Sequence, residues 1–122
     1  MDKVILIVED DEKNLRLIRD LLQVKGYEIL EAGDGKRGVE LAQEKKPDLI
    51  LMDIQLPVLD GLEATRMLKE DTSTKEINVL ALTSYAMSGD EKKILEAGCD
   101  GYLTKPIDVK QFLGVVDEYL QG

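Results

Sequence analysis

The stretch from Leu49 to Asp53 constrains this chain more than any other. Four consecutive apolar residues, Leu49 to Met52, leave no polar face, so they suit a strand that is covered on both sides. Such strands are typical of a parallel sheet with helices on each face. The strand ends at the carboxylate of Asp53, and ligands of open α/β sheets bind at the carboxyl ends of the strands. We therefore predict that Asp53 is the chemical centre of the protein.

Length and charge limit the classes of protein to which the chain can belong. Its 122 residues, 43% of them hydrophobic, fit one domain, and we expect a single domain over 1–122 without an output domain. The net charge of -9 argues against nucleic acid or an anionic membrane as a direct partner. No apolar run approaches the roughly 20 residues that span a bilayer, and the first residues lack the apolar segment of a signal peptide. We predict a cytoplasmic protein.

The chain contains no histidine, and its single cysteine, Cys99, has no second cysteine to pair with. The lack of histidine removes Ser-His and Cys-His nucleophiles, His-rich zinc sites and imidazole bases. Cys99 is best explained as a small buried residue. Any chemistry must therefore come from carboxylates, hydroxyls, lysine and a borrowed metal ion.

Strand-like apolar runs alternate with segments of helical periodicity along the whole chain. The expected strands cover residues 4–8, 27–32, 49–52, 78–82 and 102–103, and a helical pattern follows each. The segment 27–32 is the least apolar and predicts an edge strand. The helix after the fourth strand has a weak apolar face, and we expect it to be the most mobile. Five such βα units predict an α/β fold with a parallel sheet between helices.

Polar side chains follow the ends of four of these strands. Right-handed crossovers place all the strand ends on one edge of the sheet, so we expect these side chains to converge. Carboxylates from two strands suit Mg²⁺, and an aspartate oxygen can attack phosphorus while metal, lysine and hydroxyl share the phosphoryl charge. Each residue alone is common on a surface, but together they favour a magnesium-assisted phosphoryl site. They are Glu9, Asp10, Asp11, Asp53, Thr83, Ser84 and Lys105.

The same residues carry a resemblance to bacterial response-regulator receiver domains of the CheY-like family. The matching motifs are Val8 to Asp11, Leu51 to Pro57 with Asp60-Gly61, Leu82 to Ser84, and Tyr102 to Pro106. The resemblance covers essentially the whole chain. It implies a flavodoxin-like, doubly wound five-stranded parallel sheet with strand order 2-1-3-4-5 and five helices. Within the family, residues 52–57, 89–91 and 98–99 are similar to single-domain regulators of the DivK type.

The resemblance also implies a role in two-component (phosphorelay) signal transduction. Asp53 would accept a phosphoryl group from a sensor histidine kinase or a histidine phosphotransfer protein. The domain would catalyse only its own Mg²⁺-dependent phosphorylation and dephosphorylation, so it would not be an enzyme for external substrates. Mn²⁺ would substitute for Mg²⁺.

The metal ligands implied by the resemblance come from two strand ends. Asp10, Asp53 and the backbone carbonyl of Gln55 would contact Mg²⁺ directly, while Glu9 would act mainly through water. Glu9 departs from the aspartate of many relatives. Gln55 and Tyr85 lie at positions that vary in the family, where side chains screen the phosphoryl group from water.

The remaining site residues implied by the resemblance would contact the phosphoryl group or respond to it. Lys105 would pair with it, and Thr83 would hydrogen-bond to it together with the Ser84 amide. Tyr102 would be the aromatic switch that follows Thr83, and the bond between Lys105 and Pro106 is cis in relatives. A downstream protein would bind the face formed by the fourth helix, the fifth strand and the fifth helix.

Three other classes of protein remain as alternatives. The first is an interaction module that keeps the receiver fold and is not switched by phosphate. The second is a magnesium-dependent phosphatase, which would require a second acid two residues after Asp53, where this chain has Gln55. The third is a flavodoxin, which is disfavoured because three acids after the first strand would repel the flavin phosphate.

Overall fold

Strands and helices alternate through the chain in the order that the sequence predicts. The computed structural model describes residues 3–84 and 88–121. The elements are β1 (Val4–Val8), α1 (Glu12–Val24), β2 (Glu28–Ala32), α2 (Gly35–Lys45), β3 (Leu49–Asp53), α3 (Gly61–Glu70), β4 (Asn78–Thr83), α4 (Ser88–Glu96), β5 (Gly101–Thr104) and α5 (Val109–Gln121). The prediction of five βα units is therefore confirmed.

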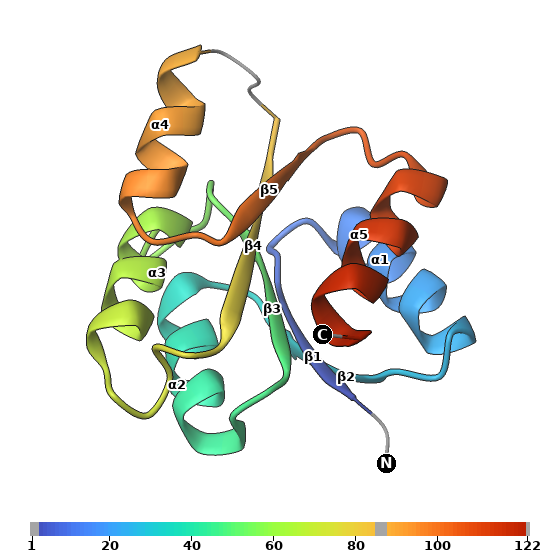
Figure 1. Cartoon of the computed structure of the whole chain (residues 1–122), viewed down its shortest axis with the longest axis horizontal. Coiled ribbons are helices and arrows are strands. Elements are labelled where there is room, and N and C mark those ends of the chain that lie inside the picture. The colour runs from blue at the N-terminus through green and yellow to red at the C-terminus, as the bar shows by residue number, and fades with distance from the viewer. Residues whose placement is uncertain (1–2, 85–87, 122) are drawn as a thin grey trace.

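All five strands are parallel and lie in the order β2-β1-β3-β4-β5. Helices α1 and α5 cover one face of the sheet, and α2, α3 and α4 cover the other (Figure 1). This is the doubly wound arrangement with strand order 2-1-3-4-5, and it places β2 at an edge as predicted. The central strand β3 is buried at every residue, because helices lie over both of its faces.

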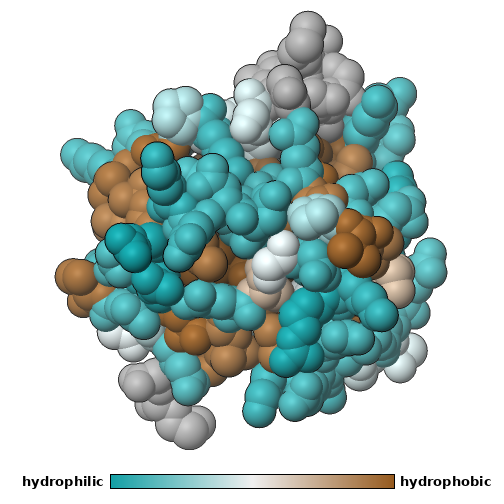
Figure 2. Space-filling view, turned by 180° about the vertical axis from the view of Figure 1, so that it is seen from behind, coloured by the Kyte–Doolittle hydropathy of each residue, from teal (hydrophilic) through white to brown (hydrophobic). Residues whose placement is uncertain are grey.

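The core is split by the sheet into two apolar layers. The layer under α1 and α5 includes Ile18, Leu22 and Phe112, while the layer under α2 and α3 includes Ala42 and Leu68. The face opposite to the view of Figure 1 is mostly hydrophilic, with apolar patches interrupted by polar side chains (Figure 2). Two-sided burial of this kind holds the strand ends in place, and the functional residues sit at those ends.

Aspartates begin four of the helices at the carboxyl edge of the sheet. Asp11, Asp34, Asp60 and Asp108 each accept a hydrogen bond from the backbone amide two or three residues further along, at 2.8–3.0 Å. A side-chain oxygen in this position satisfies an amide that has no partner within the helix. Asp11, which the sequence groups with the acids of the site, is therefore engaged as a helix cap.

Two further predictions can be compared with the structure only in part. Tyr85 is one of residues 85–87, which lie outside the described residues, so its screening role stays a prediction. The mobility of α4 also stays a prediction. Within residues 3–84 and 88–121, no helix has the length and apolar character needed to cross a membrane.

Candidate functional site

The register of the sheet brings the predicted site residues to one edge. Val8 lies opposite Met52, Asp53 opposite Leu82, and Thr83 opposite Thr104. β1, β3, β4 and β5 therefore end at the same edge of the sheet, and the strands run upward toward this edge in Figure 1. This alignment places the residues that follow β1 and β5 beside the end of β3, although they are distant in sequence.

Glu9, Asp53 and Lys105 form a buried group of charges at this edge. The Lys105 Nζ atom donates to Oε1 of Glu9 at 2.8 Å and to Oδ2 of Asp53 at 2.9 Å. Glu9 is 1% exposed and Asp53 is 5% exposed. Among the described residues, the other oxygen of Glu9, Oε2, is buried without a hydrogen-bond partner. Two carboxylates thus share one ammonium group, which leaves an excess of negative charge in a buried place.

Asp53 is held in position by its own strand and by the loop that follows. The amide of Gln55 donates to Oδ1 of Asp53 at 2.9 Å. Gly61, at the start of α3, packs so closely that a Cβ atom there would overlap the Asp53 carbonyl oxygen. Only glycine allows this approach. The side chain of Asp53 is therefore presented in one orientation, with Oδ2 turned toward Lys105.

The charges of this group shift the pKa of each member. Burial is the largest effect on Glu9, and with the hydrogen bond to Asp53 it raises the pKa of Glu9 to about 7. Burial also raises the pKa of Asp53, but hydrogen bonds with Glu9, Lys105 and the Gln55 amide outweigh it, so that pKa lies below its usual range. Burial lowers the pKa of Lys105, and its two carboxylate partners reverse this and raise it. Asp53 and Lys105 are therefore both charged at neutral pH.

Three carboxylates at this edge are suited to a hard divalent cation. One oxygen from each of Glu9, Asp10 and Asp53 lies within 4.8 Å of the others. Asp10 is exposed, whereas the other two are buried, so the group opens to solvent at Asp10. Oxygen donors and the unpartnered Oε2 of Glu9 fit Mg²⁺, which binds through a few carboxylates and keeps part of its water.

The other predicted residues surround Asp53 at different depths. Thr83, the last residue of β4, is 1% exposed, and its carbonyl accepts from the amide of Lys105 at 2.7 Å. Ser84 follows it at the surface. Tyr102 is half-buried in β5, and a hydrogen bond to Glu91 of α4 raises its pKa. The peptide bond between Lys105 and Pro106 is cis, as the family resemblance implies.

Sequence reasoning missed two close backbone approaches and one ion pair at this site. The sequence predicts a helix that starts near Gly61 and a turn at Gly33-Asp34-Gly35, but it does not show why these positions need glycine. The structure packs Gly35 so tightly that a Cβ atom there would overlap the Leu59 carbonyl oxygen, which fixes the loop after Asp53. The pairing of Glu9 with Lys105 was also not predicted. The Asp-Gly pairs at 34–35 and 60–61 were the available signal for the glycines, while the ion pair left no signal in sequence.

The family can now be decided from comparison with known proteins. The sequence model of the family described as response regulator receiver domain matches residues 5–117 of this chain. The chain belongs to the family of response regulator receiver domains. It is 48% identical over 120 residues to the polar-differentiation response regulator DivK of Brucella anthropi, and the match covers 98% of each chain. The chain is thus a DivK-like receiver domain of two-component signalling, as the sequence motifs indicated.

Solved structures of receiver domains share its fold. The receiver domain of the sensor histidine kinase PA1611 from Pseudomonas aeruginosa PAO1, which holds a magnesium ion in its active-site cleft, is 34% identical with a TM-score of 0.93 over all of both chains. A chain in the co-crystal structure of the Saccharomyces cerevisiae phosphotransfer protein Ypd1 with the receiver domain of Ssk1 is 29% identical with a TM-score of 0.90. That match covers 98% of this chain and 90% of the other.

Proposed function

We propose that this receiver domain accepts a phosphoryl group on Asp53 in a Mg²⁺-dependent reaction. The observation that carries the proposal is the buried Asp53 carboxylate, with Lys105 Nζ at 2.9 Å and oxygens of Glu9 and Asp10 within 4.8 Å. The donor is a sensor histidine kinase or a histidine phosphotransfer protein. The co-crystal structure of Ypd1 with the Ssk1 receiver domain, a similar fold, supports a partner of this class.

The chemistry requires a nucleophile, charge neutralisation and a fixed geometry. An oxygen of Asp53 attacks the phosphorus of the phosphohistidine, the P–N bond breaks, and its electron pair returns to the donor imidazole. The product is an acyl phosphate on Asp53. The Lys105 ammonium and the Thr83 hydroxyl take up charge on the phosphoryl oxygens, and the Ser84 amide adds a hydrogen bond.

Glu9, Asp10, Asp53 and the Gln55 carbonyl would hold the magnesium ion, and Mn²⁺ would occupy the same oxygens. When bound, the cation offsets the repulsion among the carboxylates and the incoming phosphoryl group. The magnesium ion in the cleft of the similar Pseudomonas receiver domain supports this assignment.

Phosphorylation would change the structure outside the site through movements of Thr83 and Tyr102. A phosphoryl group adds roughly -1.5 to -2 charges, which draws the Thr83 hydroxyl and Lys105 toward it. Thr83 lies one residue after Leu82, and Tyr102 lies opposite Ala81 in the neighbouring strand, so movement at the end of β4 is transmitted to β5. The hydrogen bond between Tyr102 and Glu91 would then change, altering the face of α4, β5 and α5 that binds a downstream protein.

Incubation with Mg²⁺ and acetyl phosphate, followed by intact-protein mass measurement, tests the proposal. The wild-type chain should gain one phosphoryl mass, and Asp53→Asn should gain none. Asp20→Asn is the matched control, because Asp20 is an exposed acid of α1 away from the site, and it should be phosphorylated like wild type.

Failure of the wild type to form an adduct, with either acetyl phosphate or a phosphorylated histidine phosphotransfer protein, would overturn the proposal. A partner that binds wild type and Asp53→Asn equally, with and without phosphodonor, would instead favour an interaction module that phosphate does not switch.

A further inference from the structure

Glu9 makes a contact that the topology of the sheet does not require. It follows β1, while Lys105 follows β5, and two strands, β3 and β4, separate β1 from β5 in the sheet. The Glu9 side chain nevertheless reaches the Lys105 ammonium at 2.8 Å, and it is fully buried in doing so. The contact therefore ties the loop after β5 to the end of β1 across the site.

The length of the glutamate matters for this contact. An aspartate at position 9 would carry the same charge on a side chain that is one methylene shorter. Lys105 also bonds to Asp53 at 2.9 Å, so without Glu9 its only carboxylate partner among the described residues would be the proposed phosphoacceptor itself. Phosphorylation would then consume the oxygen that orients the lysine.

We propose that Glu9 is a positioning residue that holds the Lys105 ammonium at the site independently of Asp53. This inference rests on the proposed phosphorylation of Asp53 for its functional meaning. Glu9 Oε1 keeps Lys105 beside the phosphoryl group when the Asp53 oxygen is no longer available to it. The second oxygen, Oε2, is buried without a partner among the described residues, so it remains free to face the cation.

The charges of the group support a shared role of this kind. With all three carboxylates ionised, as a bound cation would favour, Glu9, Asp10 and Asp53 carry three negative charges and Lys105 carries one positive charge, which leaves two for a divalent cation to neutralise. Within that balance, Glu9 and Lys105 form a neutral pair by themselves. The other two carboxylates are left to the metal and to the phosphoryl transfer.

The side-chain ammonium resonance of Lys105 tests the inference directly, because hydrogen exchange of its protons with water reports the hydrogen bonds that hold them. The resonance would be assigned by its loss in Lys105→Arg. In the metal-free protein and with Mg²⁺, wild type and Asp53→Asn should both show slow exchange. Glu9→Asp should exchange at least about tenfold faster, as expected for the loss of a hydrogen bond between charged groups.

Two variants distinguish the effect of side-chain length from the effect of charge and from a general disruption of the fold. Glu12→Asp makes the same substitution at an exposed residue of the first turn of α1 and should exchange like wild type. Glu9→Gln keeps the side-chain length and loses the charge, so the exchange rate of its Lys105 protons should lie between those of wild type and Glu9→Asp. It replaces Glu9→Asp in the test if that variant does not fold.

Exchange in Glu9→Asp equal to wild type, or complete loss of protection in Asp53→Asn, would overturn the inference. The functional readout is the rate of phosphorylation by acetyl phosphate at saturating Mg²⁺. Glu9→Asp should lower the maximal rate and leave the donor concentration for half-maximal rate unchanged. A wild type that shows protected Lys105 protons but gains no phosphoryl mass would refute the proposed function while leaving the positioning contact established.

Discussion

The edge of the sheet at the carboxyl ends of the strands (the carboxyl edge) and the opposite edge at their amino ends (the amino edge) use charged side chains in different ways. At the carboxyl edge, Lys105 is shared by Glu9 and Asp53, and a carboxylate oxygen of Glu9 has no partner among the described residues. At the amino edge, Lys69 donates to the carbonyls of Lys75 and Ile77 and to Oδ2 of Asp100, at 2.7–3.2 Å. One edge thus has an excess of acid, and the other is balanced.

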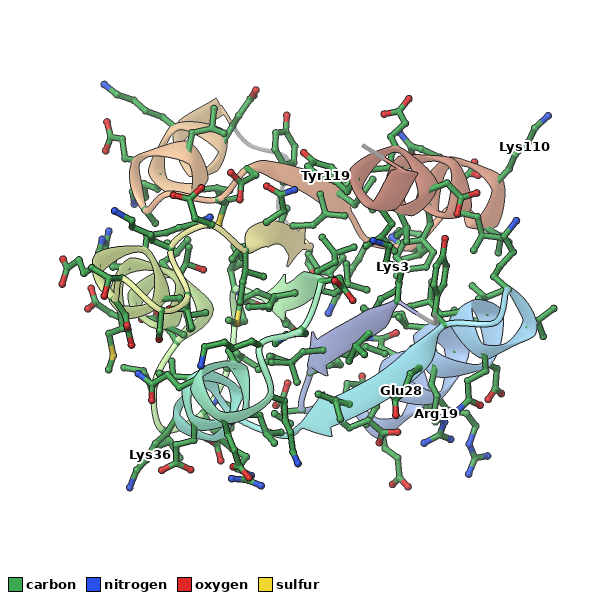
Figure 3. All side chains as sticks on the ribbon, turned by 60° about the horizontal axis from the view of Figure 1, so that its bottom comes forward. Lys3, Arg19, Glu28, Lys36, Lys110 and Tyr119 are labelled. Carbon is green, nitrogen blue, oxygen red and sulfur yellow. The ribbon has the colours of Figure 1, made fainter. Side chains whose placement is uncertain are left out.

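Backbone groups take part in most of the contacts of the amino edge that involve Lys69 and Asp100. Oδ2 of Asp100 also accepts from the Val79 amide at 2.8 Å, and the Asp100 carbonyl accepts from the Tyr119 hydroxyl at 3.0 Å. Figure 3 shows Tyr119 of α5 lying beside the sheet, whereas Lys36 and Lys110 point away from the protein. Balanced contacts of this kind join the loops before β4 and β5 to α3 and α5.

The comparison distinguishes charges that stabilise the fold from charges that are available for the proposed function. A buried charge with all its bonds made stabilises the surrounding chain, while like charges left together cost stability unless a ligand offsets them. Such a cost is typical of reactive sites, because a carboxylate whose charge is already neutralised by protein groups gains little by binding a cation or reacting with a phosphoryl group.

The largest expected effect comes from removing the cation of the balanced edge. Lys69→Met should lower the free energy of unfolding by about 3 kcal/mol, because it leaves the Asp100 carboxylate and two backbone carbonyls without their shared donor. Urea unfolding measures it. Phosphorylation of the folded fraction should be unchanged, and a loss of less than about 1 kcal/mol would show that this network is not structural.

Magnesium should stabilise the protein through the other edge. At a hundred times its Kd, Mg²⁺ should raise the free energy of unfolding by about 2.7 kcal/mol, since it binds the folded chain alone. The rise should shrink strongly in Asp53→Asn and stay at the wild-type size in Asp100→Asn. Calorimetric unfolding with and without Mg²⁺ measures it, and an equal rise in both variants would place the cation elsewhere.

Replacement of an acid by its amide should change the free energy of unfolding in opposite directions at the two edges. In metal-free protein, Asp100→Asn should lower the free energy of unfolding by about 2 kcal/mol, because Lys69 loses its charged partner. Glu9→Gln should raise it by about 1 kcal/mol above pH 7, because the pKa of Glu9 is raised on folding and its buried negative charge therefore costs stability. Urea unfolding in chelator gives both values. A loss in both variants would contradict the contrast between the edges.

The smallest effect concerns a second bond near the amino edge. The Tyr27 hydroxyl donates to Oδ1 of Asp117 in α5 at 2.5 Å, and burial followed by this bond raises the pKa of Tyr27 to about 12. Tyr27→Phe should lower the free energy of unfolding by about 1 kcal/mol at pH 8. Because the pKa is raised on folding, this contribution is complete below pH 10 and is lost as the pH rises toward 12.

Unfolding of wild type and Tyr27→Phe between pH 8 and pH 12 measures that contribution. The difference between the two chains should close over the upper two pH units. A difference that stays constant across the range would show that the tyrosine stabilises the protein by packing alone.

Most of the fold followed from local patterns in the sequence. Apolar runs such as Leu49 to Met52 report burial on both faces, and the 3.6-residue period reports one buried face, so the alternation of elements is visible without a structure. The placement of the candidate site residues at one edge was predictable for the same reason, because parallel strands of known direction have their carboxyl ends on one edge. Thus Asp53 and Thr83 could be expected near one another before any distance was known.

Contacts between distant loops were not predictable, because they depend on sheet twist and side-chain reach. Nothing in the sequence around Glu9 signals that it reaches past two strands to Lys105, or that Lys69 is satisfied by Asp100 and two carbonyls. The need for glycine at position 61 appears only when α3 is packed against the end of β3.

The amino-acid sequence by itself determined the order of elements, the two-layer core and the identity of the acids at the carboxyl edge. Only the tertiary structure decided which acid Lys105 holds and which oxygen is left without a partner. The physical reason is that periodicity encodes the face on which a residue lies, whereas an ion pair depends on distances of a few ångströms between separate strands.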